Sequence, residues 1–239
     1  MITTKKYSLK GLRTKPPHIS TSGGYWVGVS HHQLLTHLND AVRDHGWVIG
    51  DHRTYTYKKG RGMIAAHDII TSPLPPVMSF RGYVPSLAIL NDNSGEASVR
   101  MYGGFRSLKT NAGLVCYEWV VGKHTIHVPF KDRIHDIVGH FKKILPFLIE
   151  EMHRWENRYL DSRNHVNVAL FFAGRQKLIP WSRLSGVDVT YDASPQTALG
   201  LFHAFATQAG RSPVTKQLRN IHEFYLIIKK TLSEKRGTS

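Results

Sequence analysis

The spacing of apolar residues changes near residue 130, and this change constrains the fold more than any other feature of the chain. Before it, apolar and polar residues alternate in short runs such as Val99–Arg106 and Leu114–Val121. After it, apolar residues recur three and four positions apart between about Asp132 and Leu160. Alternation is typical of strands, whereas spacings of three and four form one stripe along a helix. The sequence therefore predicts a sheet followed by helices.

The first half of the chain predicts one helix and about five strands. Ser30 can cap a helix from His31 to about His45, and Gly46 is expected to end it. A glycine turn at Lys59-Gly60-Arg61 predicts a hairpin between the first two strands. The expected strands are Trp47–Lys58, Gly62–Thr71, Val77–Leu90, Val99–Arg106 and Leu114–Val121, the last with a continuation at Lys123–Val128.

The second half is expected to be helical. Pro146 should kink or divide the helix that starts near Asp132. Val166–Ala173 fits a strand and a buried helix equally well, and Trp181–Tyr191 is expected to be loop with a short strand. Helices at Gln196–Gln208 and Val214–Leu232 complete the prediction.

The fold class predicted from these elements is α+β. It comprises an antiparallel sheet of about five strands with one N-terminal helix and a helical C-terminal half. Residues 1–22 are basic, contain Pro16-Pro17 and are expected to form a flexible arm. Residues 23–239 are expected to form a single domain, sheet-rich at 47–128 and helical at 131–232.

Positive charge is the strongest compositional signal. The chain has 32 lysines and arginines against 17 aspartates and glutamates, a net charge of +15 and an isoelectric point near 10.0. A field of this sign attracts phosphate backbones, so nucleic acid is the expected partner. The N-terminus lacks an apolar signal segment, and no stretch is long and apolar enough for a membrane span. A cytoplasmic protein that does not bind membranes is expected.

Two predicted strands interleave cations with aromatic residues, in Arg53–Arg61 and Arg100–Arg106. A sheet face of this kind suits single-stranded nucleic acid, whose bases stack on rings while phosphates meet lysine and arginine. The alternative is that the tyrosines are half-buried strand residues. The predicted phosphate ligands are Arg53, Lys58, Lys59, Arg61, Arg100, Arg106 and Lys109, and the predicted stacking residues are Tyr55, Tyr57 and Tyr102.

A family resemblance appears within Leu87–Val128. The features of this stretch are, in order, an Asn-rich loop, an arginine, Thr110-Asn111-Ala112-Gly113-Leu114, a strand pair and His124-Thr125. This order resembles that of an uncharacterised-domain family of phage- and plasmid-like proteins. Gln196–Thr207 is similar to that family's Asn-Ala-Thr helix. Lys109 stands where relatives often carry cysteine, and His203 where they more often carry asparagine. The resemblance implies a mobile-element origin, and it adds Asn111 and His124 to the site as binding residues or as loop braces.

A second resemblance covers about 40 residues. The first helix, Gly46-Trp47 and the hairpin that follows are similar to the opening elements of phage single-strand annealing proteins. Annealing requires two strands to be held side by side, so a homo-oligomer is expected. The helix near residues 132–160 ends in Trp155 and Tyr159, which could supply an apolar contact surface.

Enzyme chemistry finds little support in the sequence. The fifteen histidines lack the shared-face spacing of metal ligands, the acids are scattered, and Cys116 stands alone. No cofactor or metal and no catalytic residue are therefore expected. The predicted function is binding or annealing of single-stranded DNA in recombination, repair or replication of a phage or plasmid. The alternatives are an anti-defence accessory protein that inhibits a host complex by direct binding and a metal-dependent nucleic-acid enzyme. A host or phage protein is a further possible partner.

Overall fold

The computed structural model describes residues 5–6, 28–57, 61–70, 82–94, 98–123, 128–160, 163–192, 196–212 and 214–233. Strands in these ranges are β1 (Lys5–Lys6), β2 (Val48–Tyr57), β3 (Gly62–Ile70), β4 (Tyr83–Asp92), β5 (Val99–Ser107) and β6 (Gly113–Gly122). Helices are α2 (His31–Asp44), α3 (Phe130–Asn157), α4 (Arg163–Arg175), α5 (Trp181–Asp192), α6 (Ala198–Ala209) and α7 (Val214–Ser233).

The strands form one sheet in the order in which they occur along the chain, β1 to β6. Neighbouring strands are antiparallel, and the two-residue β1 joins the edge of β2 through Lys5 opposite Thr56. Five long strands, an N-terminal helix and a helical C-terminal half confirm the predicted α+β class. Most of the predicted basic arm at residues 1–22 lies outside the described residues.

Helix α2 begins and ends where the sequence predicts. The Ser30 hydroxyl accepts a hydrogen bond from Gln33 N at 3.3 Å, which caps the first turn. Gly46 adopts a left-handed φ of +75°, and Trp47 N donates to Val42 O at 3.0 Å. This is the hydrogen-bond pattern of a glycine-terminated helix. The apolar stripe of the helix is fully buried at Leu34, Leu35, Leu38 and Val42.

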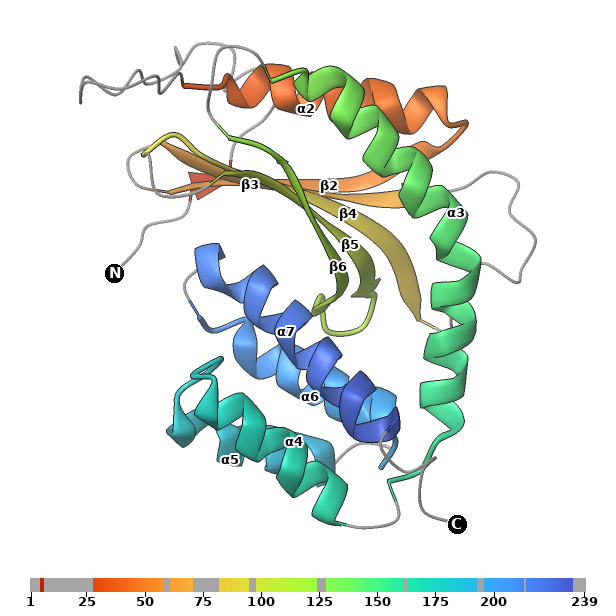
Figure 1. Ribbon diagram of the computed structural model, residues 1–239, viewed down its shortest axis with the longest axis vertical. Helices are drawn as coiled ribbons and strands as arrows, with labels where there is room; N and C mark the ends of the chain where they lie inside the picture. The colour runs from red at the N-terminus through yellow and green to blue at the C-terminus, as the bar shows by residue number, and fades with distance from the viewer. Residues whose placement is uncertain are drawn as a thin grey trace. The chain divides into compact units, whose positions relative to one another are not determined.

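The chain groups into two compact units. The first contains Met1–Val77, Val84–Gly103 and Glu118–Leu145, and the second contains Met78–Tyr83, Gly104–Tyr117 and Pro146–Ser239. In the first unit, α2 and the N-terminal part of α3 lie on one face of the sheet (Figure 1). The rings of Trp47 and Trp119 both meet Phe141 of α3 edge-on, with centroids 6.0 and 6.1 Å apart. The single domain expected at 23–239 stays a prediction.

In the second unit, helices α4 to α7 form a closed group in which α4 packs on α7, α7 on α6, α6 on α5 and α5 on α4. Helix α6 is the most buried of them, with Phe202 and Phe205 fully inside. Phe205 stacks on Phe224 of α7 with centroids 3.8 Å apart. Trp155 of α3 is only 5% exposed, because it packs on Phe202 and Tyr225. The aromatic contact surface expected at Trp155 is therefore used inside the unit.

Helix α3 continues through Pro146, so the helix is not divided there, and the alternative of a kink at Pro146 stays a prediction. Proline removes the donor that Lys142 O would otherwise receive. Pro146 lies on an exposed face, where water can satisfy that carbonyl, while Leu145, Leu148 and Met152 keep the buried stripe continuous. Packing of this stripe outweighs the loss of one helical hydrogen bond.

Two segments of the second half differ from expectation. Trp181–Asp192 is helix α5, so the predicted loop with a short strand is wrong. Its Leu184, Val187 and Tyr191 are buried at helical spacing against the helix group, and this packing overrides the strand preference of Val187. Val166–Ala173, which fitted either element, lies in α4. Parts of two predicted strands, at residues 77–81 and 124–127, lie outside the described residues.

Candidate nucleic-acid interface

Arg53, a predicted phosphate ligand on β2, is held by acids of the first unit. Its guanidinium donates to Asp68 Oδ1 at 3.2 Å, and Asp51 lies 3.6 Å from its Nε. Arg53 pairs with Ala66 across the strands, so Asp68 stands two residues further along the same face of β3. The Asp68 side chain is only 3% exposed. Arg53 is therefore corrected from a free cation to a member of an internal ion pair.

Tyr57, a predicted stacking residue, is 2% exposed. It pairs with Gly62 across the β2–β3 hairpin, and a Cβ added to Gly62 would stand 2.1 Å from the tyrosine ring. The ring therefore lies across the glycine and fills the space of its missing side chain. The predicted base stacking at Tyr57 is wrong for this reason, whereas Tyr55 is half-buried beside Ile64.

Arg100 and Tyr102 share one face of β5, as the strand alternation predicts, but both are bound to Glu118 of β6. Arg100 forms an ion pair with Glu118 Oε1, and the Tyr102 hydroxyl donates to the same oxygen at 3.3 Å. Tyr102 is 3% exposed, and burial, with Glu118 beside it, raises the pKa of its phenol. The predicted phosphate ligand at Arg100 and stacking ring at Tyr102 are corrected to a cross-strand cluster in which the tyrosine is buried and Arg100 is half-buried.

Five of the remaining predicted residues fall into two groups. Arg61 and Lys109 are exposed, the first in the first unit and the second in the second unit. Lys58, Lys59 and His124 lie outside the described residues. Among the described residues of the predicted site, Arg61 and Lys109 are thus the cations most open to solvent.

The loop between β5 and β6, which carries the family-like Thr110-Asn111, is braced from below by Arg106. Its guanidinium donates to Asn111 Oδ1 at 2.7 Å, and Arg106 itself is only 9% exposed. Asn111 has a left-handed φ of +58°, which asparagine tolerates better than most residues. Thr110 N donates to Ser107 Oγ at 3.2 Å. These contacts favour bracing over ligand binding for Arg106 and Asn111.

His203 of α6 ties this loop to the helices of the second unit. Its Nε2 lies 3.1 Å from Thr110 Oγ1, and its Nδ1 lies 2.9 Å from the Tyr83 hydroxyl. Burial lowers the pKa of His203, and Lys109 lowers it further. A neutral imidazole donates from one nitrogen and accepts at the other, so it can bridge two hydroxyl groups. The pKa of Tyr83 is raised to about 12, chiefly by burial, so its hydroxyl stays protonated.

The two segments that carry the family resemblance therefore meet, although Thr110 and His203 are 93 residues apart in sequence. Sequence reasoning did not include Tyr83 or His203 in the site. His203 had a visible signal as the one ionisable residue of an otherwise apolar and small-residue helix, Ala198–Ala209. Tyr83 had none, because only the β4–β5 pairing brings it to the loop, where Leu108 N donates to Gly82 O at 2.8 Å.

The braced loop can present a cation without further ordering. Leu108 is 59% exposed, and Lys109 and Thr110 beside it are also exposed. A loop that is already held in place loses less conformational entropy when it binds a phosphate. Over the part of the chain that the structure describes, no three histidine, cysteine, aspartate or glutamate residues gather closely enough to hold a metal ion.

Fold and site together define an α+β protein with a strongly basic composition and a braced cationic loop. No family model, curated protein or solved structure matches the chain. None of its described helices has the length and apolar content required to cross a membrane.

Proposed function

We propose that this protein binds nucleic acid, with single-stranded DNA as its preferred form, in recombination, repair or replication of a phage or plasmid. The observation that carries the proposal is the surplus charge of +15. Each internal pair, such as Arg53 with Asp68 or Arg100 with Glu118, removes one base and one acid together. Internal pairing therefore leaves the surplus unchanged, and a surplus of this size attracts phosphates.

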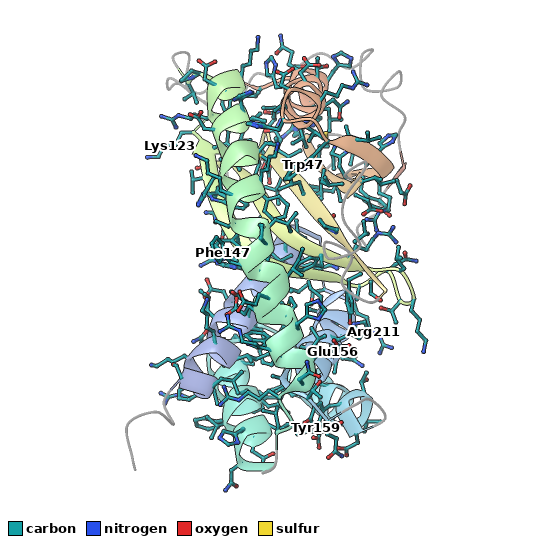
Figure 2. The ribbon with its side chains drawn as sticks, turned by 90° about the vertical axis from the view of Figure 1, so that its right-hand side faces the viewer. Trp47, Lys123, Phe147, Glu156, Tyr159 and Arg211 are labelled. Atoms are coloured by element: carbon teal, nitrogen blue, oxygen red, sulfur yellow. The ribbon has the colours of Figure 1, made fainter. Side chains whose placement is uncertain are left out.

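Exposed aromatic side chains support the preference for single strands. Trp181 is 60% exposed and Phe171 is 51% exposed in the second unit. The guanidinium carbon of Arg175 lies 5.9 Å from the centre of the Phe171 ring, which sets a cation beside an exposed ring. Phe147, labelled in Figure 2, is 71% exposed. Unpaired bases can stack on such rings, whereas the bases of a duplex already stack on each other.

Self-association is part of the same proposal, since annealing needs two strands held together. It rests on that requirement alone, because Trp155 is buried within the second unit. Sedimentation of the protein with and without DNA tests it. A monomer in both conditions would remove the oligomer and the annealing role but leave DNA binding standing.

The test of binding itself is fluorescence anisotropy with single-stranded DNA, duplex DNA and RNA of equal length, at low and at physiological salt. We expect the tightest binding to single-stranded DNA. The logarithm of affinity should fall with the logarithm of salt by about 0.7 for each phosphate contacted. Equal affinity for duplex and single strand would contradict the strand preference, and no binding at low salt would contradict the proposed function.

A further inference from the structure

Residues of helices α4, α5 and α7 of the second unit line an open cavity of about 320 Å³. Among the described residues, its lining includes three cations, Lys177, Arg183 and Lys216, and no acid. The loop Leu178–Pro180 and the side chain of Trp181 supply its apolar wall. Volumes from about 300 Å³ upward are typical of small-ligand sites, and an apolar wall with a few converging polar groups is typical of their lining.

Trp181 is fixed at one edge and open elsewhere. Its benzo edge lies on Gly174 of α4, where an added Cβ would stand 2.3 Å from the ring. Gly174 therefore leaves the space that lets the indole lie against the helix backbone. The side chain nevertheless stays 60% exposed at the cavity. A ring held in this way offers a stacking surface with little further loss of side-chain entropy.

The walls of the cavity are joined by side-chain hydrogen bonds. Arg183 Nη1 donates to Ser212 Oγ at 3.2 Å, which links α5 to the turn before α7. The Asn220 amide donates to Leu178 O, which links α7 to the loop after α4. This bond engages one of the two N–H donors of the Asn220 amide.

Lys177 is placed at the cavity by an unusual backbone. Its φ is +55°, in the left-handed region where glycine is preferred after a helix. Lys177 N donates to Gly174 O at 2.9 Å and Leu178 N donates to Ala173 O at 3.0 Å, the pattern that ends a helix at such a residue. A lysine here costs more backbone strain than glycine, and it adds a positive charge to the cavity.

The local sequence holds few acids that could neutralise these cations. Residues 163–220 contain seven lysines and arginines against two acids, Asp188 and Asp192, and neither acid lines the cavity. Three cations beside a fixed, exposed indole match the chemistry of a nucleotide, which has an aromatic base and an anionic phosphate.

We infer that this cavity holds one nucleotide of a bound single strand, with its base stacked on Trp181 and its phosphate among Lys177, Arg183 and Lys216. The inference rests on the proposed function and gives it a location. It assigns the main stacking contact to the helical second unit rather than to the sheet tyrosines.

The first test replaces the ring. Trp181→Leu should weaken binding of a fluorescent oligodeoxythymidine about 5- to 150-fold, the range expected for one stacked base. Tyr159→Leu is the matched control, because Tyr159 is 67% exposed and does not line the cavity. The control should change affinity less than twofold. Melting temperatures of both variants show whether they are folded.

The second test replaces the charge without disturbing the fold. Glycine suits the left-handed backbone of residue 177, so Lys177→Gly should be at least as stable as the native protein. Its plot of log affinity against log salt should flatten by about 0.7. Lys230→Ala is the control, 14 residues beyond Lys216 on α7 and thus about 21 Å along the helix. The salt-dependence slope measured for Lys230→Ala should equal that of the native protein.

Deoxyadenosine monophosphate and inorganic phosphate, each tested alone, separate failure of the inference from failure of the proposed function. Tight oligonucleotide binding that is unaffected by Trp181→Leu and Lys177→Gly would overturn the inference and leave the proposed function intact. Binding of the mononucleotide without any binding of oligonucleotide would overturn both, since the cavity would then serve a free nucleotide. Binding of inorganic phosphate as tight as that of the mononucleotide would remove the stacking role of Trp181.

Discussion

The sheet of the first unit and the helices of the second use their cations in opposite ways. In the sheet, Arg53 is bound to Asp68 and Arg100 is bound to Glu118. In the helices, Lys177, Arg183 and Lys216 line a cavity to which no acid contributes in the described part of the chain. A basic and aromatic strand looked like the better binding surface in the sequence, yet the helical segment keeps more of its charge available.

This difference in ion pairing follows from the distances between side chains on neighbouring strands and from the local number of acids. Strand pairing sets side chains of adjacent strands about 4.5–5.5 Å apart, so a cation on one strand readily meets an acid on the next. Glu118, for example, reaches Arg100 although 18 residues separate them. Residues 163–220 contain two acids and seven cations, and one of these cations, Arg219, lies 3.9 Å from Glu223 just beyond this range. Local charge balance is therefore a better guide to free cations than a strand motif is.

Breaking the ion pair of the first unit should have the largest effect. Asp68→Ala leaves the Arg53 guanidinium, whose side chain is 18% exposed, without its buried partner. We expect a loss of about 3 kcal/mol in the free energy of unfolding. Asp51→Ala is the matched control, because Asp51 also contacts Arg53 but is 57% exposed, and it should cost under about 0.5 kcal/mol. Urea unfolding measures both, and equal losses would contradict the internal role of Asp68.

Burial of His67 in the first unit should make the protein sensitive to acid. His67 is 2% exposed, and in the described part of the chain neither of its ring nitrogens has a hydrogen-bond partner. Burial, with His52 and Arg53 adding to it, lowers its pKa from 6.5 to about 4. The unfolded chain therefore takes up the proton first as the pH falls. Stability should be complete above about pH 6.5 and fall by up to about 3 kcal/mol by pH 4.

Leucine substitutions compare the buried His67 of the first unit with His203 of the second unit, which forms hydrogen bonds. His67→Leu loses no described hydrogen bond, so its stability at pH 7 should equal or exceed that of the native protein, and its acid sensitivity should be smaller. His203→Leu loses the contacts to Tyr83 and Thr110 and should cost about 2 kcal/mol at pH 7. Urea unfolding at several pH values distinguishes them. If the stability of His67→Leu falls with pH as much as that of the native protein, His67 is not the source of the acid sensitivity.

The braced loop of the second unit predicts a graded effect at Asn111. Asn111→Ala loses the hydrogen bond from Arg106 and puts a less tolerant residue at φ +58°, which should cost about 2 kcal/mol. Asn111→Gly loses the bond but suits the backbone, so about 1 kcal/mol is expected. Melting curves of both variants and of the native protein, recorded in parallel, give their order of stability. A glycine variant less stable than the alanine variant would contradict the backbone argument.

The smallest predicted effect is a gain. Glu118→Gln removes the charge that neutralises Arg100 and so converts a paired cation of the sheet into a free one. We expect single-stranded DNA affinity to rise about threefold at low salt, with a salt dependence steeper by about 0.7. Anisotropy titrations measure both quantities. A drop in affinity in a folded variant would show that the cross-strand cluster positions a binding residue.

Local signals in the sequence were sufficient for several elements. Ser30 and Gly46 bound α2 because capping and left-handed termination depend on neighbouring residues only. Alternation of apolar and polar residues correctly predicted most of strands β2, β3 and β5. It failed at α5, where Gly186, Val187 and Val189 favour extended structure while burial of Leu184 and Tyr191 favours helix. Side-chain packing outside the segment decided that conflict.

The sequence alone determined the α+β class, the positive surplus and the bounds of α2, since periodicity, charge and caps are properties of short stretches of chain. Only the tertiary structure decided which cations are free. It placed Asp68 beside Arg53, Glu118 beside Arg100 and Gly62 beneath Tyr57, and it brought His203 to Thr110. These partners lie far apart in sequence or on the next strand, and strand register and helix packing determine which of them meet.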